Sequence, residues 1–168
     1  MMRRRSMWLA TFVALVIAML LTTHSAALSI STAAVTFPNV NLTGYDQSVV
    51  GATSAWQVDA TGELSGWNAT ILATEFTNGF GGVIPVSNLE FRLADANISL
   101  VSGDPTLPSS AQTSYTSLSG TALRFLSAAS GTGDGIYNLL PEFRLTIPAE
   151  TYVGNYTSTL TISVNAGP

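Results

Sequence analysis

The feature that most constrains the fold is an alternation of apolar and polar side chains that repeats every second residue. It is clearest in residues 156–164, where Leu160, Ile162 and Val164 alternate with Thr159, Thr161 and Ser163. Successive side chains of a β-strand point to opposite faces, so this pattern predicts a strand with one buried and one polar face. Shorter runs of the same kind predict further strands over residues 30–37, 55–59, 69–76, 83–86, 89–93, 98–101, 123–126 and 143–147.

Turn-forming residues separate these runs at intervals of about eight to twelve residues, which is the spacing of a sandwich or barrel. After residue 28 we find no helical periodicity with capping residues. The segment 106–119 is polar, contains proline and lacks a period, so we expect it to be a long surface loop. We therefore predict an all-β fold: a single antiparallel β-sandwich of the immunoglobulin-like or Greek-key type.

Residues 1–27 have the layout of a secretory signal peptide. Arg3, Arg4 and Arg5 precede the apolar run 8–21, and small residues end the segment at Ala27. We expect cleavage there, which leaves residues 28–168 as one secreted domain. A membrane anchor is the alternative interpretation, but a spanning helix needs about 20 apolar residues.

The residues missing from the mature segment restrict its chemistry. Residues 28–168 contain no His, Cys or Lys. Ser-His-Asp, Cys-His and Ser-Lys nucleophile systems therefore cannot form. Zinc, copper and haem sites normally use His or Cys as ligands, and this segment contains neither. We expect no enzyme activity, no cofactor and no metal. A distant alternative is a carbohydrate-active enzyme that uses two carboxylates. We interpret the glycine-rich residues 130–135 as a flexible turn, with calcium binding through Asp134 as the alternative.

The charge balance restricts the partners. Three arginines against ten carboxylates give residues 28–168 a formal charge of 3 − 10 = −7. This acidic surface repels phosphate, so we expect no nucleic-acid partner, and there is no polybasic patch for an anionic membrane. We expect no membrane insertion after signal cleavage. Arg92, Arg124 and Arg144 each lie between apolar residues of a predicted strand, so we expect all three to point to solvent.

Two segments carry aromatic motifs. Trp56-Gln57-Val58 opens a strand–turn–strand segment that continues through Trp67, and the C-terminal segment reads Tyr156-x-x-x-Leu160-Thr161-Ile162-x-Val164-x-x-x-Pro168. Together they resemble the two motifs of the WxL domain, a surface module of Gram-positive bacteria, over residues 30–168. Val58 and Val164 replace leucines of the family pattern, and Ile162 replaces its second tryptophan.

The resemblance implies a cell-surface domain that binds peptidoglycan or another cell-wall glycan without a covalent bond and assembles with co-secreted surface proteins. The candidate binding residues are Trp56, Val58, Trp67, Tyr156, Thr157, Thr159, Leu160 and Thr161. The two tryptophans are either core anchors or platforms for a sugar ring, and the threonines form either a solvated face or a glycan-binding ridge. The alternative function is a structural subunit of an extracellular fibre or matrix, joined through strand edges.

Overall fold

The computed structural model describes residues 28–167, and almost all of its regular structure is β-strand. Within that part of the chain, the only helical elements are two short 3₁₀ turns, η1 (Val86–Asn88) and η2 (Asp95–Asn97). None of its helices is long and apolar enough to cross a membrane. The signal peptide expected in residues 1–27 lies outside the described residues.

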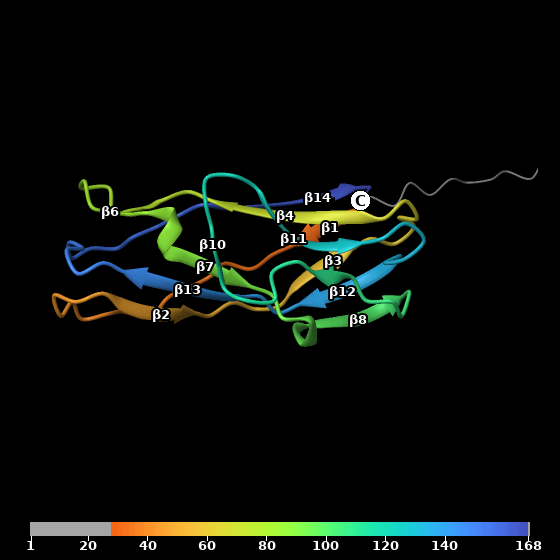
Figure 1. The fold of residues 1–168 in the computed structure, drawn as a ribbon, viewed down its shortest axis with the longest axis horizontal. Coiled ribbons are helices and arrows are strands. Elements are labelled where there is room, and N and C mark those ends of the chain that lie inside the picture. Colours follow the sequence, from red (N-terminus) through yellow and green to blue (C-terminus); the bar gives the residue numbers. More distant parts are fainter. Residues whose placement is uncertain (1–27, 168) are drawn as a thin grey trace, which may run out of the picture.

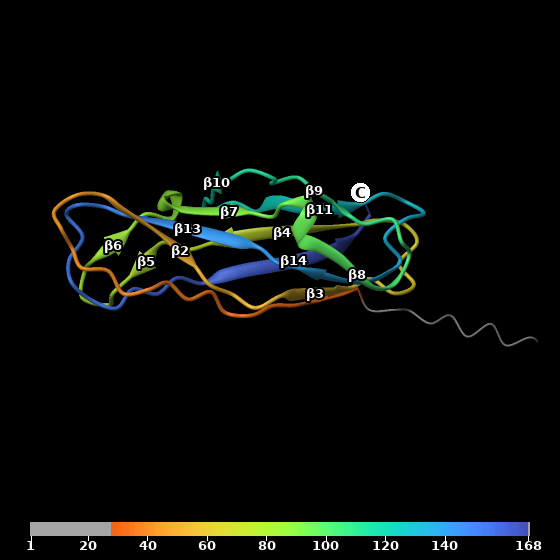
Figure 2. The same ribbon diagram turned by 90° about the horizontal axis from the view of Figure 1, so that it is seen from below.

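One layer of the sandwich, the long layer, consists of two four-stranded sheets set end to end (Figures 1 and 2). The first sheet has the order β1 (Ser29–Ser31), β3 (Trp56–Asp59), β12 (Gly135–Leu139) and β8 (Ile98–Gly103). The second has the order β10 (Thr116–Ser117), β7 (Leu89–Arg92), β13 (Glu142–Ile147) and β2 (Gln47–Gly51). The chain passes from one sheet into the other along β2–β3, β7–β8 and β12–β13, although no strand of one sheet pairs with a strand of the other in the described residues.

The facing layer, the short layer, has the order β14 (Leu160–Ala166), β4 (Trp67–Ala73), β11 (Leu123–Ala128) and β9 (Ser109–Ser110). A small hairpin of β5 (Phe76–Thr77) and β6 (Val83–Ile84) continues from β4 toward one end of the molecule. Every strand pair in the described residues is antiparallel. The prediction of an all-β antiparallel sandwich is therefore confirmed.

Four buried aromatic rings join the two layers. Phe91 lies 5.2 Å from Phe125 and 5.4 Å from Phe143 between ring centroids, and Trp56 lies 5.8 Å from Phe143. Phe125 comes from the short layer and the other three rings from the long layer. Each ring is fully buried. Edge-to-face contacts of this kind add to the free energy that area burial alone supplies.

A second aromatic pair closes the other end of the core. The rings of Trp67 and Tyr137 are 6.4 Å apart. Trp67 Nε1 donates a hydrogen bond to the carbonyl of Gly133 at 3.0 Å, and the Tyr137 hydroxyl donates to the carbonyl of Asp104 at 2.9 Å. Both buried side chains thus have their polar atoms bonded, as burial requires. Gly133 has φ +75°, and a side chain there would meet Trp67.

The structure corrects several predicted elements. Strands β2 and β12 were not expected, and the expected loop 106–119 contains β9 and β10. The strand predicted from Tyr156 begins at Leu160, with only a single bridge, between Thr157 and Thr77, before it. In β11 a β-bulge follows Arg124, so the next two residues, Phe125 and Leu126, are both buried where strict alternation would expose one. A bulge adds one residue to a strand and resets which face follows.

The aromatic cluster makes a direct stability prediction. Truncating Phe125, which is fully buried, to alanine should lower the free energy of unfolding by about 3–5 kcal/mol because it leaves a cavity between the layers. The same change at Phe80, which is 95% exposed, should alter it by no more than roughly 0.5 kcal/mol. Chemical denaturation of residues 28–168 measures both. Equal effects of the two substitutions would contradict the described core.

Candidate functional site

A groove of about 840 Å³ opens along one side of the sandwich. One wall is an extended segment, residues 32–42, which we call the strap. The other wall is formed by residues 151–158 and the first half of β14. In Figure 2 the strap is the orange chain along the lower margin, close to the blue chain that leads into β14. Buried core side chains that include Trp56, Phe143 and Leu145 lie beneath the groove, and half-buried apolar side chains such as Ile147 and Ile162 line it above them.

The strap lies on the core but belongs to no sheet. Ala33, Val35 and Phe37 are half-buried and pack against the core, and the residues between them are exposed. Thr36 exchanges two backbone hydrogen bonds with Ala52, at 2.9 and 2.8 Å, and this is the strap's only bridge within residues 28–167. The strand predicted over residues 30–37 is therefore split into β1 and the strap.

The second wall is tied to the β5–β6 hairpin. The Tyr156 hydroxyl donates to the carbonyl of Tyr152 at 3.0 Å and accepts from Asn78 Nδ2 at 3.5 Å. Thr157 exchanges two backbone hydrogen bonds with Thr77, at 2.9 and 3.0 Å. These contacts fix the wall near the point where β14 begins.

All side chains that line the groove are uncharged. Hydroxyls and amides stand along both walls, and the rings of Phe37, Tyr152 and Tyr156 lie among them. The side chains below them are apolar. A charged group placed in such a groove would lose its hydration without gaining a partner of opposite charge. The chemistry therefore suits an uncharged ligand with both apolar and hydrogen-bonding groups.

The structure separates the candidate binding residues into three groups. Trp56, Val58 and Trp67 are fully buried, so they are core residues and are not available as platforms on the surface. Tyr156, Thr157 and Leu160 come together on the groove wall. Thr159 and Thr161 are exposed and do not line the groove.

Thr161 belongs instead to a flat polar surface on the outside of the short layer, which we call the hydroxyl face. Its polar members are outward residues of three neighbouring strands: Thr161, Ser163 and Asn165 of β14, Asn68 and Thr70 of β4, and Arg124 and Ser127 of β11. The apolar Leu72 of β4 also points outward, opposite Thr161. Directly paired residues of neighbouring strands share a face. The register sets Ser163, Thr70 and Arg124 in one row and Asn165, Asn68 and Ser127 in the next.

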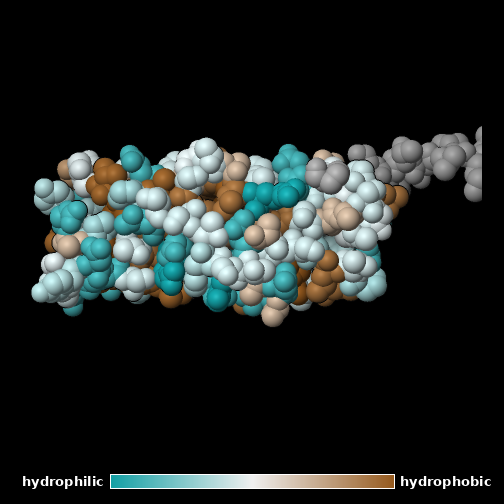
Figure 3. Space-filling model, in the orientation of Figure 1, coloured by the Kyte–Doolittle hydropathy of each residue, from teal (hydrophilic) through white to brown (hydrophobic). Residues whose placement is uncertain are grey.

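Of this face, the sequence pointed to Thr161 as a binding candidate but gave no indication of its members on β4 and β11. The polar positions of those strands, Asn68, Thr70 and Ser127, also alternate with apolar residues, but nothing local shows which strands are neighbours. In the orientation of Figure 1, the surface of the molecule is mostly hydrophilic or neutral, and its hydrophobic residues form separate patches (Figure 3).

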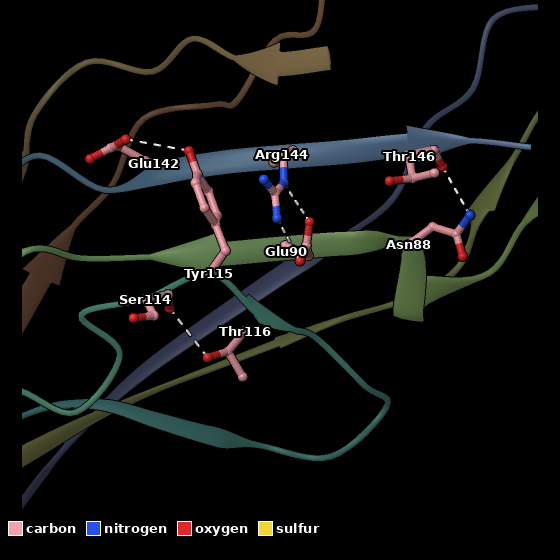
Figure 4. A network of polar contacts seen from close by, with 8 residues as sticks. All are labelled: Asn88, Glu90, Ser114, Tyr115, Thr116, Glu142, Arg144 and Thr146. Carbon is pink, nitrogen blue, oxygen red and sulfur yellow. Dashed lines mark hydrogen bonds and ion pairs between the residues drawn. The ribbon is translucent and has the colours of Figure 1, made fainter. Parts of the chain in front are cut away.

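Two arginines do not point freely into solvent as expected. On the outside of the long layer, Arg144 Nε donates to Glu90 at 2.6 Å and Arg92 pairs with Glu142 at 2.5 Å. The ring of Tyr115 lies against both guanidinium groups, with its centroid 4.8 Å from Arg92 and 4.3 Å from Arg144. Figure 4 shows Tyr115 beside Arg144 and Glu142. The Tyr115 hydroxyl donates to Glu142 at 3.3 Å. This cluster fastens the segment between β9 and β10 to the long layer.

The cluster also shifts the ionisation of its members. The hydrogen bond from Arg144 holds the pKa of Glu90 below its ordinary value of 4.5. The bond to Glu142 raises the pKa of Arg92. Burial, together with the nearby Glu142 carboxylate, raises the pKa of Tyr115 above 10.0, so its hydroxyl keeps its proton at neutral pH. Arg124 is exposed on the hydroxyl face and forms no ion pair with any described residue.

The glycine-rich run 130–135 is a turn held by carboxylates. Asp134 accepts a hydrogen bond from the backbone of Gly62 at 2.6 Å, and Asp104 accepts from Gly133 at 3.0 Å and Thr106 at 2.8 Å. These bonds lower the pKa of Asp104, with the Thr106 backbone as the largest cause. Within residues 28–167, no three residues of the His, Cys, Asp and Glu types are grouped as a metal site would need.

No family model matches the chain, and no curated protein matches it. Three solved chains match in fold. One belongs to a study of glycolipid glycan hydrolysis by a family 123 glycoside hydrolase from Clostridium perfringens, with 12% identity and a TM-score of 0.39. The match covers 73% of this chain but only 19% of that enzyme, and a likeness this weak assigns no function.

The Glu90–Arg144 pair makes a pH-dependent prediction. Because the folded pKa of Glu90 is lowered, the pair stabilises the fold above about pH 4.5 and loses that contribution as the pH falls through the folded pKa. The variant Glu90→Gln should therefore be less stable than the parent near pH 7, and the difference should shrink below pH 4. Denaturation curves from pH 3 to pH 7 measure it.

The exposed Glu75 supplies the matched control. Glu75→Gln should change the unfolding free energy near pH 7 by no more than roughly 0.5 kcal/mol. A difference between parent and Glu90→Gln that stayed constant over this pH range would refute the assignment of the pair.

Proposed function

We propose that the chain is a non-enzymatic, secreted domain of the bacterial cell surface that binds the cell wall through its hydroxyl face. The observation that carries this proposal is the set of hydroxyl and amide side chains that the register aligns across β14, β4 and β11 around Arg124. Peptidoglycan presents sugar hydroxyls, amides and peptide carboxylates, and each has a matching partner in that set.

Arg124 would make the hydroxyl face favour ligands that carry a negative charge. The other two arginines of residues 28–168 are held by Glu90 and Glu142, whereas Arg124 is exposed. A guanidinium group can hold a carboxylate through two parallel hydrogen bonds, and such charge-assisted bonds are stronger than neutral ones. Arg124 would bind a peptide carboxylate while the hydroxyl and amide side chains beside it bind sugar.

The positions of the acidic residues support a binding role over catalysis. Glu90 and Glu142 are bonded to arginines, Asp104 and Asp134 hold turns, and no carboxylate lines the side groove. The resemblance to the WxL domain favours the same role. Assembly with co-secreted surface proteins remains part of the proposal and needs a second surface.

Sedimentation with insoluble peptidoglycan tests this function. Purified residues 28–168 should pellet with the wall material in a saturable manner, and Arg124→Gln should weaken the apparent affinity about tenfold or more because the lost bond is charge-assisted. No pelleting above an unrelated acidic protein would remove the proposal.

A matched pair of substitutions then locates the surface. Ser163→Glu places a carboxylate on the hydroxyl face, and Ser99→Glu places the same charge on an exposed position of β8 in the long layer. The first should abolish pelleting and the second should leave it unchanged. Equal effects would show that net charge, and not this face, controls binding.

A further inference from the structure

We propose that the side groove is a docking site for an extended, uncharged β-strand of a partner protein, which adds to the outer edge of β14. This site is separate from the hydroxyl face, so it does not depend on glycan binding. The inference comes from the backbone groups that border the groove, the apolar floor beneath them and the absence of charge along its walls.

The outer edge of β14 has free backbone groups. At the two ends of the β14–β4 pair, Thr74 N–H donates to the Thr159 carbonyl at 3.0 Å and Gly167 N–H donates to the Gly66 carbonyl at 2.7 Å. Bonded and non-bonded pairs alternate along an antiparallel ladder. The N–H and C=O groups of Leu160 and Ile162 therefore point away from β4, and within residues 28–167 no strand pairs with that edge.

The same residues border the groove. Ser158, Leu160 and Ile162 line it, while Thr159 and Thr161 do not. Strand β1 approaches β14 without pairing with it. Proteins usually protect a free edge with charged side chains, proline or a bulge. Strand β14 has no charged residue, no proline and no register shift in its pairing with β4.

The strap presents a second free edge across the groove. Thr36 directs its backbone groups to Ala52, so those of Val35 and Phe37 point to the opposite side. Neither residue makes a backbone hydrogen bond with any other described residue. A strand placed between the strap and β14 could therefore bond along both of its edges, as in strand-addition complexes.

The floor and the charge balance define the occupant. One face of an inserted strand would lie on the half-buried apolar side chains that line the groove, Ile147, Leu160 and Ile162, and its other face would point to solvent. Apolar side chains at every second position satisfy that arrangement. The groove holds no charge to pair with a charged residue, although residues 28–168 carry a formal −7. The partner segment is therefore an uncharged strand of about five residues with alternating apolar side chains.

A peptide of this chemistry tests the site. The probe is an acetylated and amidated peptide with the sequence of residues 157–164, which is uncharged and alternates Thr or Ser with Leu, Ile and Val. It should bind purified residues 28–168 saturably in isothermal titration calorimetry. On binding, the amides of Leu160, Ile162, Val35 and Phe37 should exchange with deuterium at least about tenfold more slowly, because each gains a hydrogen-bond acceptor.

Modified peptides isolate the backbone contribution without altering the protein. N-methylation of alternate residues removes the donors on one edge of the strand and should weaken binding about tenfold or more. Glutamate at the three apolar positions should abolish binding. Equal affinity of the N-methylated peptide, or binding without protection of the β14 amides, would overturn the proposal.

A matched protein pair completes the experiment. Asn39 and Thr113 are both exposed, but only Asn39 lines the groove. Asn39→Trp should weaken peptide binding at least about fivefold by filling the groove, and Thr113→Trp should not. Peptidoglycan fragments should leave the four amides unprotected even if they bind the hydroxyl face. Protection of those amides by the fragments, with none by the peptide, would assign the groove to glycan and refute strand docking.

Discussion

The contact of Phe125 with the rings of Trp56 and Phe91 is the interaction on which the rest of the structure depends. It is where the short layer meets the long layer, and residues 28–168 have no cysteine to crosslink them in any other way. A domain of this size without disulfides relies on buried apolar area for its stability. The groove and the hydroxyl face keep their geometry only while these rings hold the layers together.

Among the described residues, no charged side chain is buried in that core. Tyr115 brings two ion pairs together on the outer side of the long layer, and the remaining arginine lies on the short layer. A single exposed ion pair adds little to the stability of a fold. Here the two arginines of both ion pairs also contact the ring of Tyr115, and this holds the segment between β9 and β10 against the long layer. The ion pairs thus lie on the outer surface of the long layer, while the outer surface of the short layer carries Arg124, which is unpaired among the described residues.

Much of the fold follows from local pattern, but the site does not. Alternation identified β3, β4, β7 and β13 because each buries every second side chain, and it also located β11 despite its bulge and most of β14. It missed β12 because glycines precede it, although Tyr137 and Leu139 are spaced as strand residues. Neither the groove nor the rows of the hydroxyl face could be predicted, since both depend on which distant strands become neighbours. The burial of Trp56 and Trp67 likewise follows from layer packing and not from their motif.

The single bridge between Thr36 and Ala52 has a consequence for dynamics. Opening the strap breaks two backbone hydrogen bonds, the hydrogen bond from Trp56 Nε1 to the Ala33 carbonyl and the contact of a few half-buried side chains, but it leaves every sheet intact. Its free energy of local opening is therefore much smaller than that of global unfolding. Proteases would reach residues 32–42 from a native-like state, and the susceptibility of this segment would report local motion independently of the melting temperature of the domain.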